Sequence, residues 1–197
     1  MSCGDNVMKY CQPGEGTVKR TLVVTAAAAA LATFVVPIAD AAPNRDAVTE
    51  HVRAWEKAYN DVDTNKIGDL TCDKYRDREM ANNESRIPTW DDFVKPSDLY
   101  AKFPKLSQGT LDQLLDAAKR KDAAAFRQAS VQVVRENAHL TVTNIDKVNV
   151  IEAKNATATV TTSSVWGSDA PKTTTSDWYL TYERDAWRYC NPVLTVR

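Results

Sequence analysis

The sequence predicts an α+β fold in which N-terminal helices pack on one face of a curved antiparallel sheet, preceded by a signal peptide. Three observations predict it. Apolar residues recur at helical spacing as far as Val134, and from Leu140 onward they alternate with polar residues. Helices followed by consecutive strands are typical of a helical layer on an antiparallel sheet. The third observation is a basic pair followed by an alanine-rich apolar run between residues 18 and 41.

Length and composition favour one ordinary globular domain. The chain has 197 residues, of which 43% are hydrophobic and 26% charged, close to average usage in folded proteins. Its 25 basic and 26 acidic residues give a net charge of −1 without long runs of one sign. This balance gives no electrostatic reason to expect nucleic acid or an anionic membrane as a partner.

Residues 18–41 have the order of a secretory signal peptide. Lys19 and Arg20 precede an apolar run that ends near Pro37, and Ala39-Asp40-Ala41 supplies the small residues of a cleavage site. Cleavage there leaves a domain of residues 42–197. The alternative is an uncleaved membrane anchor, because the run approaches the length that spans a bilayer. We expect residues 1–17 to be a mis-called N-terminal extension, with translation starting at Val18.

Cleavage after residue 41 leaves two cysteines, Cys72 and Cys190. An even pair in an oxidising compartment normally forms a disulfide, so we predict a bridge between them. The alternative is a pair of reactive thiols or metal ligands. No His or Cys neighbours either residue at ligand spacing, which argues against a metal site.

The first helix is predicted from apolar residues at helical spacing: Val48, Val52, Trp55 and Tyr59. A shorter helix is expected over Asn65 to Leu70, whereas the charged residues 73–85 fit a helix or a loop equally well. Residues 87–109 hold three prolines, which exclude long regular elements, and four aromatic residues, which indicate that the segment packs on something.

Two more helices and a set of strands follow. Thr110-Leu-Asp-Gln113 matches a capping box and predicts a helix that starts there. Asp122 is expected to cap another helix, with its apolar face formed by Phe126, Ala129, Val133 and Val134. Strands are then predicted from alternating residues around Leu140 and Val142, Val148 and Val150, Ala156 to Trp166, Trp178 to Tyr182, and Trp187 to Cys190.

This order resembles the NTF2-like superfamily (cystatin-like α+β cone), and within it small secreted actinobacterial-type domains of unknown function. The resemblance rests on AWEKAYNDVDTNKIGDLTC in the helical half, and on NATATVTTSSVW and SDWYLTYERDAWRYC in the strand half. It implies a cone whose interior holds an apolar ligand in some members, and a bridge between the cysteines that match Cys72 and Cys190. Some members are isomerases, dehydratases or cyclases; others are binding or assembly domains at the cell envelope.

No catalytic, cofactor or metal motif is found, so we assign no catalytic residue and no cofactor. The two histidines, His51 and His139, fit a partly buried or surface role better than catalysis. The acidic pair Asp91 and Asp92 is adjacent rather than convergent, and fits a solvated loop or helix cap. The abundant Ser and Thr residues lie outside nucleophile motifs and fit a solvent-facing strand surface.

Aromatic residues are the remaining candidates for a site. Most are expected in the core, but some are candidates to line a pocket for an apolar or amphipathic molecule, with the proline-rich segment as its rim: Trp55, Tyr59, Trp90, Phe93, Trp166, Trp178 and Tyr182.

The sequence therefore favours an exported, non-enzymatic domain that binds a protein partner or a small apolar ligand at the cell envelope. One alternative is a small isomerase- or dehydratase-type enzyme acting on a lipid or polyketide-like substrate, and another is an inert secreted structural protein. Contact with the membrane is expected only through an uncleaved signal segment, and the face of the sheet is a candidate homodimer surface.

Overall fold

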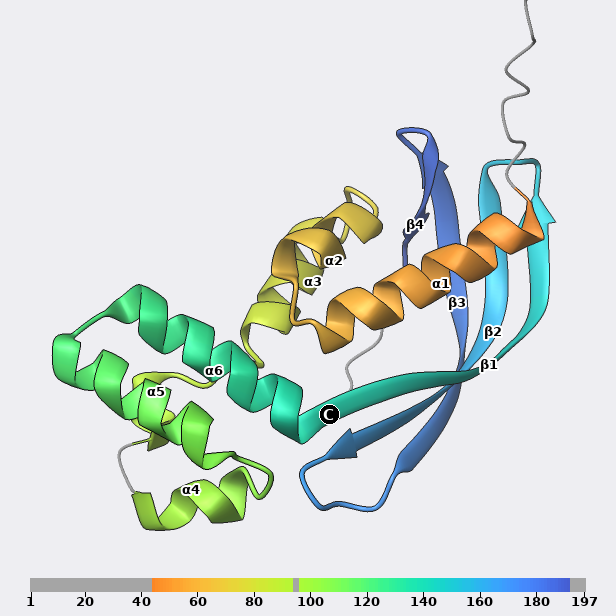
Figure 1. Ribbon diagram of the computed structural model, residues 1–197. Coiled ribbons are helices and arrows are strands. Elements are labelled where there is room, and N and C mark those ends of the chain that lie inside the picture. Colours follow the sequence, from red (N-terminus) through yellow and green to blue (C-terminus); the bar gives the residue numbers. More distant parts are fainter. Residues whose placement is uncertain (1–43, 94–95, 192–197) are drawn as a thin grey trace, which may run out of the picture. The chain divides into compact units, whose positions relative to one another are not determined.

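The computed structural model describes residues 44–93 and 96–191, which belong to one unit of the chain, Ile38–Arg197. The predicted signal peptide (residues 18–41) and the predicted N-terminal extension (residues 1–17) lie outside the described residues. The described residues have an α+β fold, with helices followed by an antiparallel sheet, as the sequence predicts (Figure 1).

The first two helices begin where the sequence supplies capping side chains. Helix α1 (Arg45–Asn60) starts after Asn44, whose side chain accepts a hydrogen bond from the Ala47 amide at 2.8 Å. Helix α2 (Thr64–Leu70) starts in the same way after Asp63. The undecided charged stretch forms helix α3 (Arg76–Glu84), with acidic residues in its first turn.

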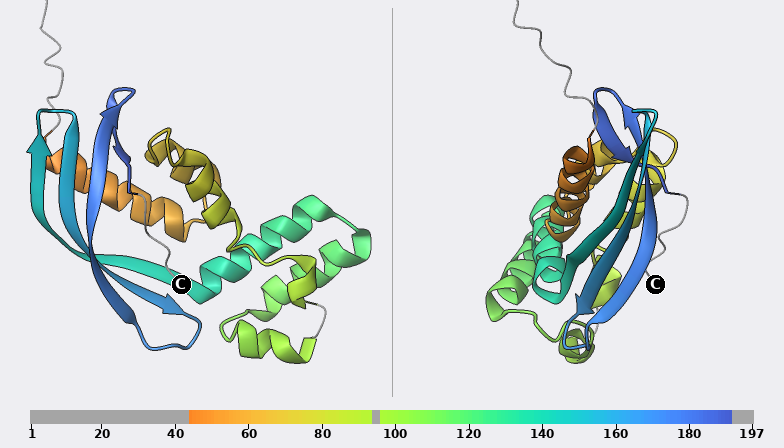
Figure 2. Two further views of the ribbon diagram at one scale, coloured as in Figure 1. Left: turned by 180° about the vertical axis from the view of Figure 1, so that it is seen from behind. Right: turned by 90° about the vertical axis from the view of Figure 1, so that its right-hand side faces the viewer.

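The sheet is a meander of four strands in the order β1 (Ala138–Ile151), β2 (Asn155–Trp166), β3 (Lys172–Glu183) and β4 (Ala186–Tyr189). Strand β1 carries two register shifts against β2, and such bulges bend a strand. The strands curve strongly, α1 lies along the sheet, and residues 96–137 form helices beyond its end (Figures 1 and 2). The α+β class predicted from the sequence is therefore confirmed.

Side chains of α1 cover the free edge of β1. Asn60 donates to the Leu140 carbonyl at 2.7 Å and accepts from the Leu140 amide at 2.9 Å. Glu56 accepts from the Val142 amide at 2.9 Å, and Arg53 donates to the Val142 carbonyl. These bonds satisfy the outward groups that would otherwise invite another strand to pair.

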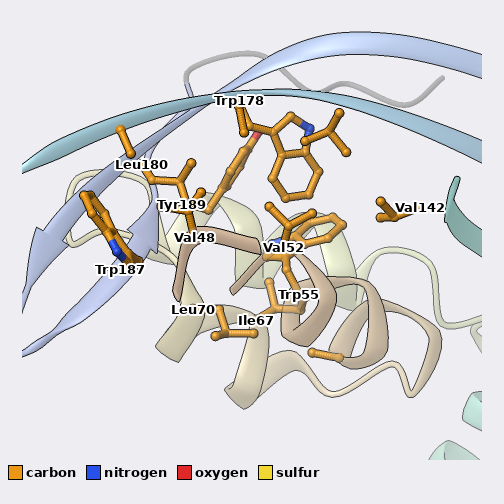
Figure 3. Packing of buried hydrophobic residues seen from close by; sticks show 14 of the residues in the cluster. Val48, Val52, Trp55, Ile67, Leu70, Val142, Trp178, Leu180, Trp187 and Tyr189 are labelled. Atoms are coloured by element: carbon orange, nitrogen blue, oxygen red, sulfur yellow. The ribbon is translucent and has the colours of Figure 1, made fainter. Parts of the chain in front are cut away.

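The main core lies between α1 and the inner face of the sheet (Figure 3). At its centre the rings of Trp55 and Trp178 meet edge to face at 5.2 Å, and those of Trp178 and Tyr189 at 4.9 Å. Val48 and Val52 of α1 are fully buried beside them. Burial of these large side chains is the main stabilising contribution to this half of the domain.

A second core is formed by the helices that follow α3 in the sequence and precede the first strand. The proline-rich segment forms a short 3-10 helix, η1 (Trp90–Phe93), and helix α4 (Pro96–Lys102). Helices α5 (Gln108–Arg120) and α6 (Ala123–Asn137) then form a hairpin. Their apolar faces enclose a separate cluster: Phe93, Leu99, Phe103, Leu106, Leu114, Ala129 and Val133.

Helix α5 starts earlier than the capping box at Thr110 predicts. Ser107 is the N-cap, and its hydroxyl accepts from the Thr110 amide at 3.2 Å. The Thr110 hydroxyl instead donates to Glu136 of α6 at 2.6 Å. Both residues suit a helix start, and the packing of α5 on α6 selects Ser107. The predicted cap of α6 is confirmed, because Asp122 accepts from the Ala125 amide at 3.0 Å.

Asn137 joins three segments at the point where α6 passes directly into β1. Its side chain donates to the Val133 carbonyl and accepts from the Lys105 amide, both at 3.0 Å. Its own carbonyl accepts from the Gly167 amide, in the turn after β2. Gly167 has a φ of 55°, and a Cβ there would lie 2.5 Å from Pro104 Cγ, so glycine is required.

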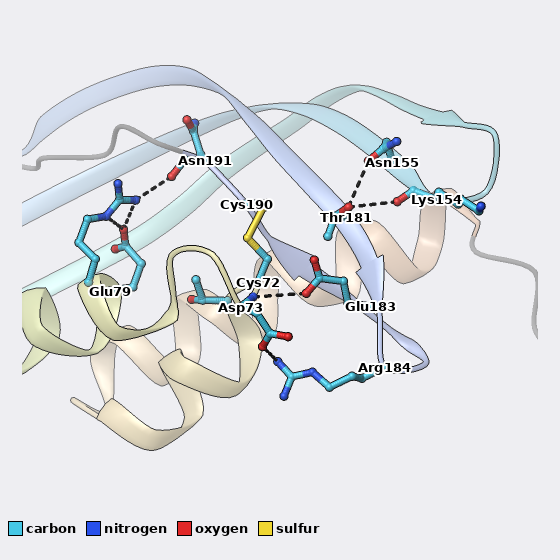
Figure 4. Close-up of a disulfide and its surroundings, with 12 residues drawn as sticks. Cys72, Asp73, Glu79, Lys154, Asn155, Thr181, Glu183, Arg184, Cys190 and Asn191 are labelled. Carbon is cyan, nitrogen blue, oxygen red and sulfur yellow. Dashed lines mark hydrogen bonds and ion pairs between the residues drawn. A yellow bond between two sulfur atoms is a disulfide. The ribbon is translucent and has the colours of Figure 1, made fainter.

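A disulfide joins the end of α2 to the end of the sheet (Figure 4). The sulfur atoms of Cys72 and Cys190 are 2.09 Å apart, their Cα atoms 5.3 Å apart, and 118 positions separate them in sequence. The Cys72 amide also donates to the Tyr189 carbonyl at 2.9 Å. The predicted bridge is confirmed, and it fastens the helical layer to β4.

We expect the double variant C72A/C190A to lose roughly 3–5 kcal/mol of unfolding free energy, because the bridge closes a long loop in the unfolded chain. Urea unfolding followed by circular dichroism measures the change. Reduction of the wild type with dithiothreitol must produce a similar loss and leave the variant unchanged. A variant as stable as the oxidised wild type would contradict this role.

We expect Asn137→Ala to lose roughly 2–3 kcal/mol of unfolding free energy, because it removes a buried side chain that bonds to both the Lys105 amide and the Val133 carbonyl. Asn144→Ala is the matched control, since that exposed side chain bonds to Asp146, two positions further along the same strand. Urea unfolding compares the two variants. Equal stabilities would show that Asn137 does not hold the junction.

Candidate functional site

The structure separates the seven predicted pocket-lining aromatics into four environments. Trp55 and Trp178 are core residues with 6% and 1% of their surface exposed. Tyr182 packs edge to face on Trp187 at 5.5 Å, at the margin of the same core. The inner face of the sheet is therefore occupied by side chains around these three residues.

Tyr59 and Trp166 come together at one end of this layer, where they line a cavity of about 400 Å³. We call it the Tyr59 cavity. Its wall is built by the end of α1, the residues after α3, the start of β1, and the hairpin between β2 and β3: Tyr59, Arg86, Ala138, His139, Ser164, Val165, Trp166, Asp169, Ala170 and Lys172. This volume suits a small organic ligand.

Both aromatic walls of the cavity are held in place by neighbouring rings. Tyr59 stacks on Trp55 at 5.3 Å. Trp166 is 37% exposed, and its ring lies 6.0 Å from that of Phe103. The Trp166 indole nitrogen donates to the Lys102 carbonyl at 3.3 Å. The end of the proline-rich segment therefore supports Trp166 beside the cavity.

Arg86 is the cavity residue that sequence reasoning missed. Its guanidinium lies over the Tyr59 ring, 3.6 Å from the centroid, a cation–π arrangement. Nη1 donates to the Tyr59 carbonyl and to the Asn83 side chain, both at 2.8 Å. Burial lowers the pKa of this guanidinium. An isolated arginine 27 positions after Tyr59 carries no sequence signal of this placement.

Two groups able to exchange protons, His139 and Asp169, also line the cavity, and both are exposed. The other histidine, His51, is on the buried face of α1 and is not part of the cavity wall. Burial, and then the positive charge of Arg188, lower its pKa to about 4; Lys66 adds a smaller effect, and a hydrogen bond to the Leu70 backbone opposes them. His51 is thus held neutral by the core.

Trp90 and Phe93 lie at the helical hairpin rather than at the Tyr59 cavity. Trp90 is 52% exposed, meets Phe126 edge to face at 5.4 Å, and lines a shallow apolar pocket of about 290 Å³. Phe93 is buried in the second core. The acidic residues beside them are not convergent either: Asp92 accepts from the Thr89 amide at 2.8 Å, as a turn cap does.

A broad polar groove of about 1150 Å³ lies between the start of α2 and the α5–α6 hairpin. One ion pair crosses it, between Arg127 and Glu84. Arg127 donates to both oxygens of Glu84, at 3.0 and 2.7 Å, which holds the pKa of that carboxyl below its usual range. Arg135 donates to the Asp61 carbonyl. Arg135 makes no ion pair among the described residues either, but its side chain is exposed to solvent, whereas that of Arg86 is half-buried.

Comparison with known proteins gives little. No protein-family profile matches the chain, and no characterised protein matches its sequence. One solved structure is similar, a domain of unknown function with a cystatin-like fold from Nostoc punctiforme. It has 14% identity and a TM-score of 0.23 over 55% of this chain and 82% of that one. A likeness at this level carries no argument about fold or function.

Among residues 44–93 and 96–191, no helix combines the length and the apolar character that a membrane span needs. In the same part of the chain, no three His, Cys, Asp or Glu side chains lie close enough together to hold a metal ion.

We expect the protein to lose stability as the pH falls from 6.5 towards 4. His51 has an ordinary pKa of 6.5 and a folded pKa of about 4, so the unfolded chain takes up the proton first. The loss reaches about 3 kcal/mol at the acid end. Above pH 6.5 this contribution is fully present and constant.

Urea unfolding at pH 7.5, 5.5 and 4.5 measures this effect. His51→Gln is expected to flatten the dependence over this interval, and the exposed His139→Gln is the matched control that keeps it. The carboxyls of Glu84 and Asp92, whose pKa values are lowered from 4.5 and 3.8, add their own loss only at lower pH. An unchanged slope in His51→Gln would contradict the assignment.

Proposed function

We propose that the chain is an exported, non-enzymatic domain that binds a small amphipathic ligand in the Tyr59 cavity. The observation that carries the proposal is the division of the predicted aromatics: Trp55 and Trp178 fill the interior, whereas Tyr59 and Trp166 line a cavity at its end. A cavity with aromatic walls and a few polar groups is the usual form of a small-molecule site.

Export and fold family are further parts of this proposal. Cys72 and Cys190 lie at disulfide distance, and such bridges persist in oxidising compartments. This supports a place outside the cytoplasm, at the cell envelope or in the medium. The four-stranded meander with α1 on its inner face supports an NTF2-like cone of the small secreted, actinobacterial type.

The enzyme hypothesis is the second candidate, and it has less support. Acid–base catalysis by an isomerase or dehydratase needs an Asp, Glu or His whose surroundings tune its pKa. His139 and Asp169 line the cavity but are exposed to solvent. The desolvated histidine, His51, is part of the core beside Leu70 instead. Binding without chemistry is therefore the function that this geometry supports best.

An alternative to a small ligand in the cavity is a protein partner that binds a different surface, the one around Trp90. Trp90 and Phe126 form an exposed apolar patch on the hairpin, whereas the outer face of the sheet is threonine-rich and polar around Tyr179. The patch and the cavity are lined by different residues, so substitutions distinguish them.

We expect the neutral dye N-phenyl-1-naphthylamine to bind one per domain in the Tyr59 cavity. Ala170→Trp should weaken binding by about tenfold or more, because the added indole occupies volume that the dye needs. Ala123→Trp is the matched control, since it places the same side chain in the Trp90 pocket. Dye fluorescence titrations measure both.

Loss of dye binding in Ala123→Trp, with Ala170→Trp unaffected, would move the site to the hairpin and overturn the proposal. Native mass spectrometry of protein from the host's medium adds a second test. We expect a mature chain starting near Ala42, two hydrogens light and carrying a small molecule. A bound molecule that changes mass during incubation would favour the enzyme.

A further inference from the structure

Arg86 carries a charge that no described side chain neutralises. It makes no ion pair among residues 44–93 and 96–191, and its Nη2 is covered without a hydrogen-bond acceptor. Its two bonds, to the Tyr59 carbonyl and the Asn83 amide oxygen, both use Nη1. These bonds explain why Arg86 fastens the end of α3 to α1, but they leave the second nitrogen unexplained.

The acidic residue nearest to Arg86 in the sequence is already paired with another arginine. Glu84, two residues before Arg86, receives both bonds of the Arg127 guanidinium and one from the Thr64 hydroxyl. A half-buried cation without a counter-charge costs free energy, and proteins normally pair it. An anion in the adjoining cavity would supply the missing partner.

The charge and the shape of the rest of the cavity wall also fit an anionic ligand. Lys172 stands with Arg86 on the basic side, against a single carboxylate, Asp169. The aromatic rings of Tyr59 and Trp166 form the apolar part of the wall. A guanidinium matches the two oxygens of a carboxylate better than any other side chain does.

We propose that the ligand of the Tyr59 cavity is a small aromatic or apolar carboxylate, whose charged end faces Arg86 and Lys172 and whose body lies against Tyr59 and Trp166. This inference rests on the proposed function and adds the chemical class of the ligand. Because Nη2 is covered in this structure, a direct bond to it requires a local shift of side chains. The charge attraction across the cavity wall does not.

Two probes of the same shape test the inference: 2-naphthoate and its neutral counterpart 2-naphthylmethanol. Their affinities are measured by displacement of N-phenyl-1-naphthylamine from the full mature domain with its disulfide intact. We expect 2-naphthoate to bind about tenfold more tightly than the alcohol, as charge-assisted contacts allow. The preference should shrink as sodium chloride is raised.

Substitutions locate the source of the preference. Arg86→Gln and Lys172→Gln should each weaken 2-naphthoate by several-fold to about tenfold and leave the alcohol unchanged. Lys119→Gln removes the same charge from α5, outside the cavity wall, and should change neither probe. Lys172→Gln keeps the test decisive if Arg86→Gln fails to fold, because Lys172 is exposed at the start of β3.

The outcomes separate this inference from the proposed function. Equal affinity for the two probes, or a preference that survives both substitutions, overturns the carboxylate and leaves the cavity as a ligand site. Both proposals are overturned if neither probe displaces the dye and Ala170→Trp does not weaken dye binding. A preference lost in the two cavity variants and kept in Lys119→Gln supports the carboxylate.

Discussion

The hydrogen bonds of the buried Asn137 hold together the segments that form the second core and the cavity. Helix α6 becomes strand β1 without a loop, so one residue must satisfy the end of a helix and the start of a sheet. Asn137 does so while also bonding to the Lys105 amide and the Gly167 amide. Ala138, the next residue, pairs with Trp166, and both line the cavity. The position of the cavity wall therefore follows from the backbone and side-chain bonds of one buried residue.

The main core favours ring packing over hydrogen bonding, and this restricts where a ligand can bind. The indole nitrogens of Trp55 and Trp178 and the hydroxyl of Tyr189 are buried, and the described part of the chain offers them no hydrogen-bond partner. Burial, reinforced by the charge of Glu79, raises the pKa of Tyr189, so its hydroxyl stays protonated. Each such group costs free energy, which the contacts of the three rings must offset. An interior filled in this way leaves its end, at Tyr59 and Trp166, as the place where a cavity forms.

Much of the fold could be predicted from sequence because its signals are local. The spacing of Val48, Val52 and Trp55 predicts α1, and alternation predicts the strands. Helix α3 could not be predicted, because its 76–84 segment has no apolar stripe and is fixed by packing, with Met80 against the bare Cα of Gly68. The cavity was half predicted: aromatic bulk pointed to Tyr59 and Trp166 but equally to the core residues Trp55 and Trp178. Arg86 was missed, since its role depends on a contact with Tyr59 that only the folded chain creates.

The pairing of Glu84 links the helical hairpin to the cavity. Glu84 lies at the end of α3. Its carboxylate can form a two-bond ion pair with one arginine, and Arg127 of α6 donates to both of its oxygens. Arg135 of the same helix holds the Asp61 carbonyl at the end of α1. Helix α6 therefore fixes the two chain segments that present Tyr59 and Arg86, and at the same time withdraws the carboxylate closest to Arg86 in sequence. In a chain of net charge −1, the cavity wall thus carries Arg86 and Lys172 against one carboxylate, Asp169, while Glu84 is paired with Arg127.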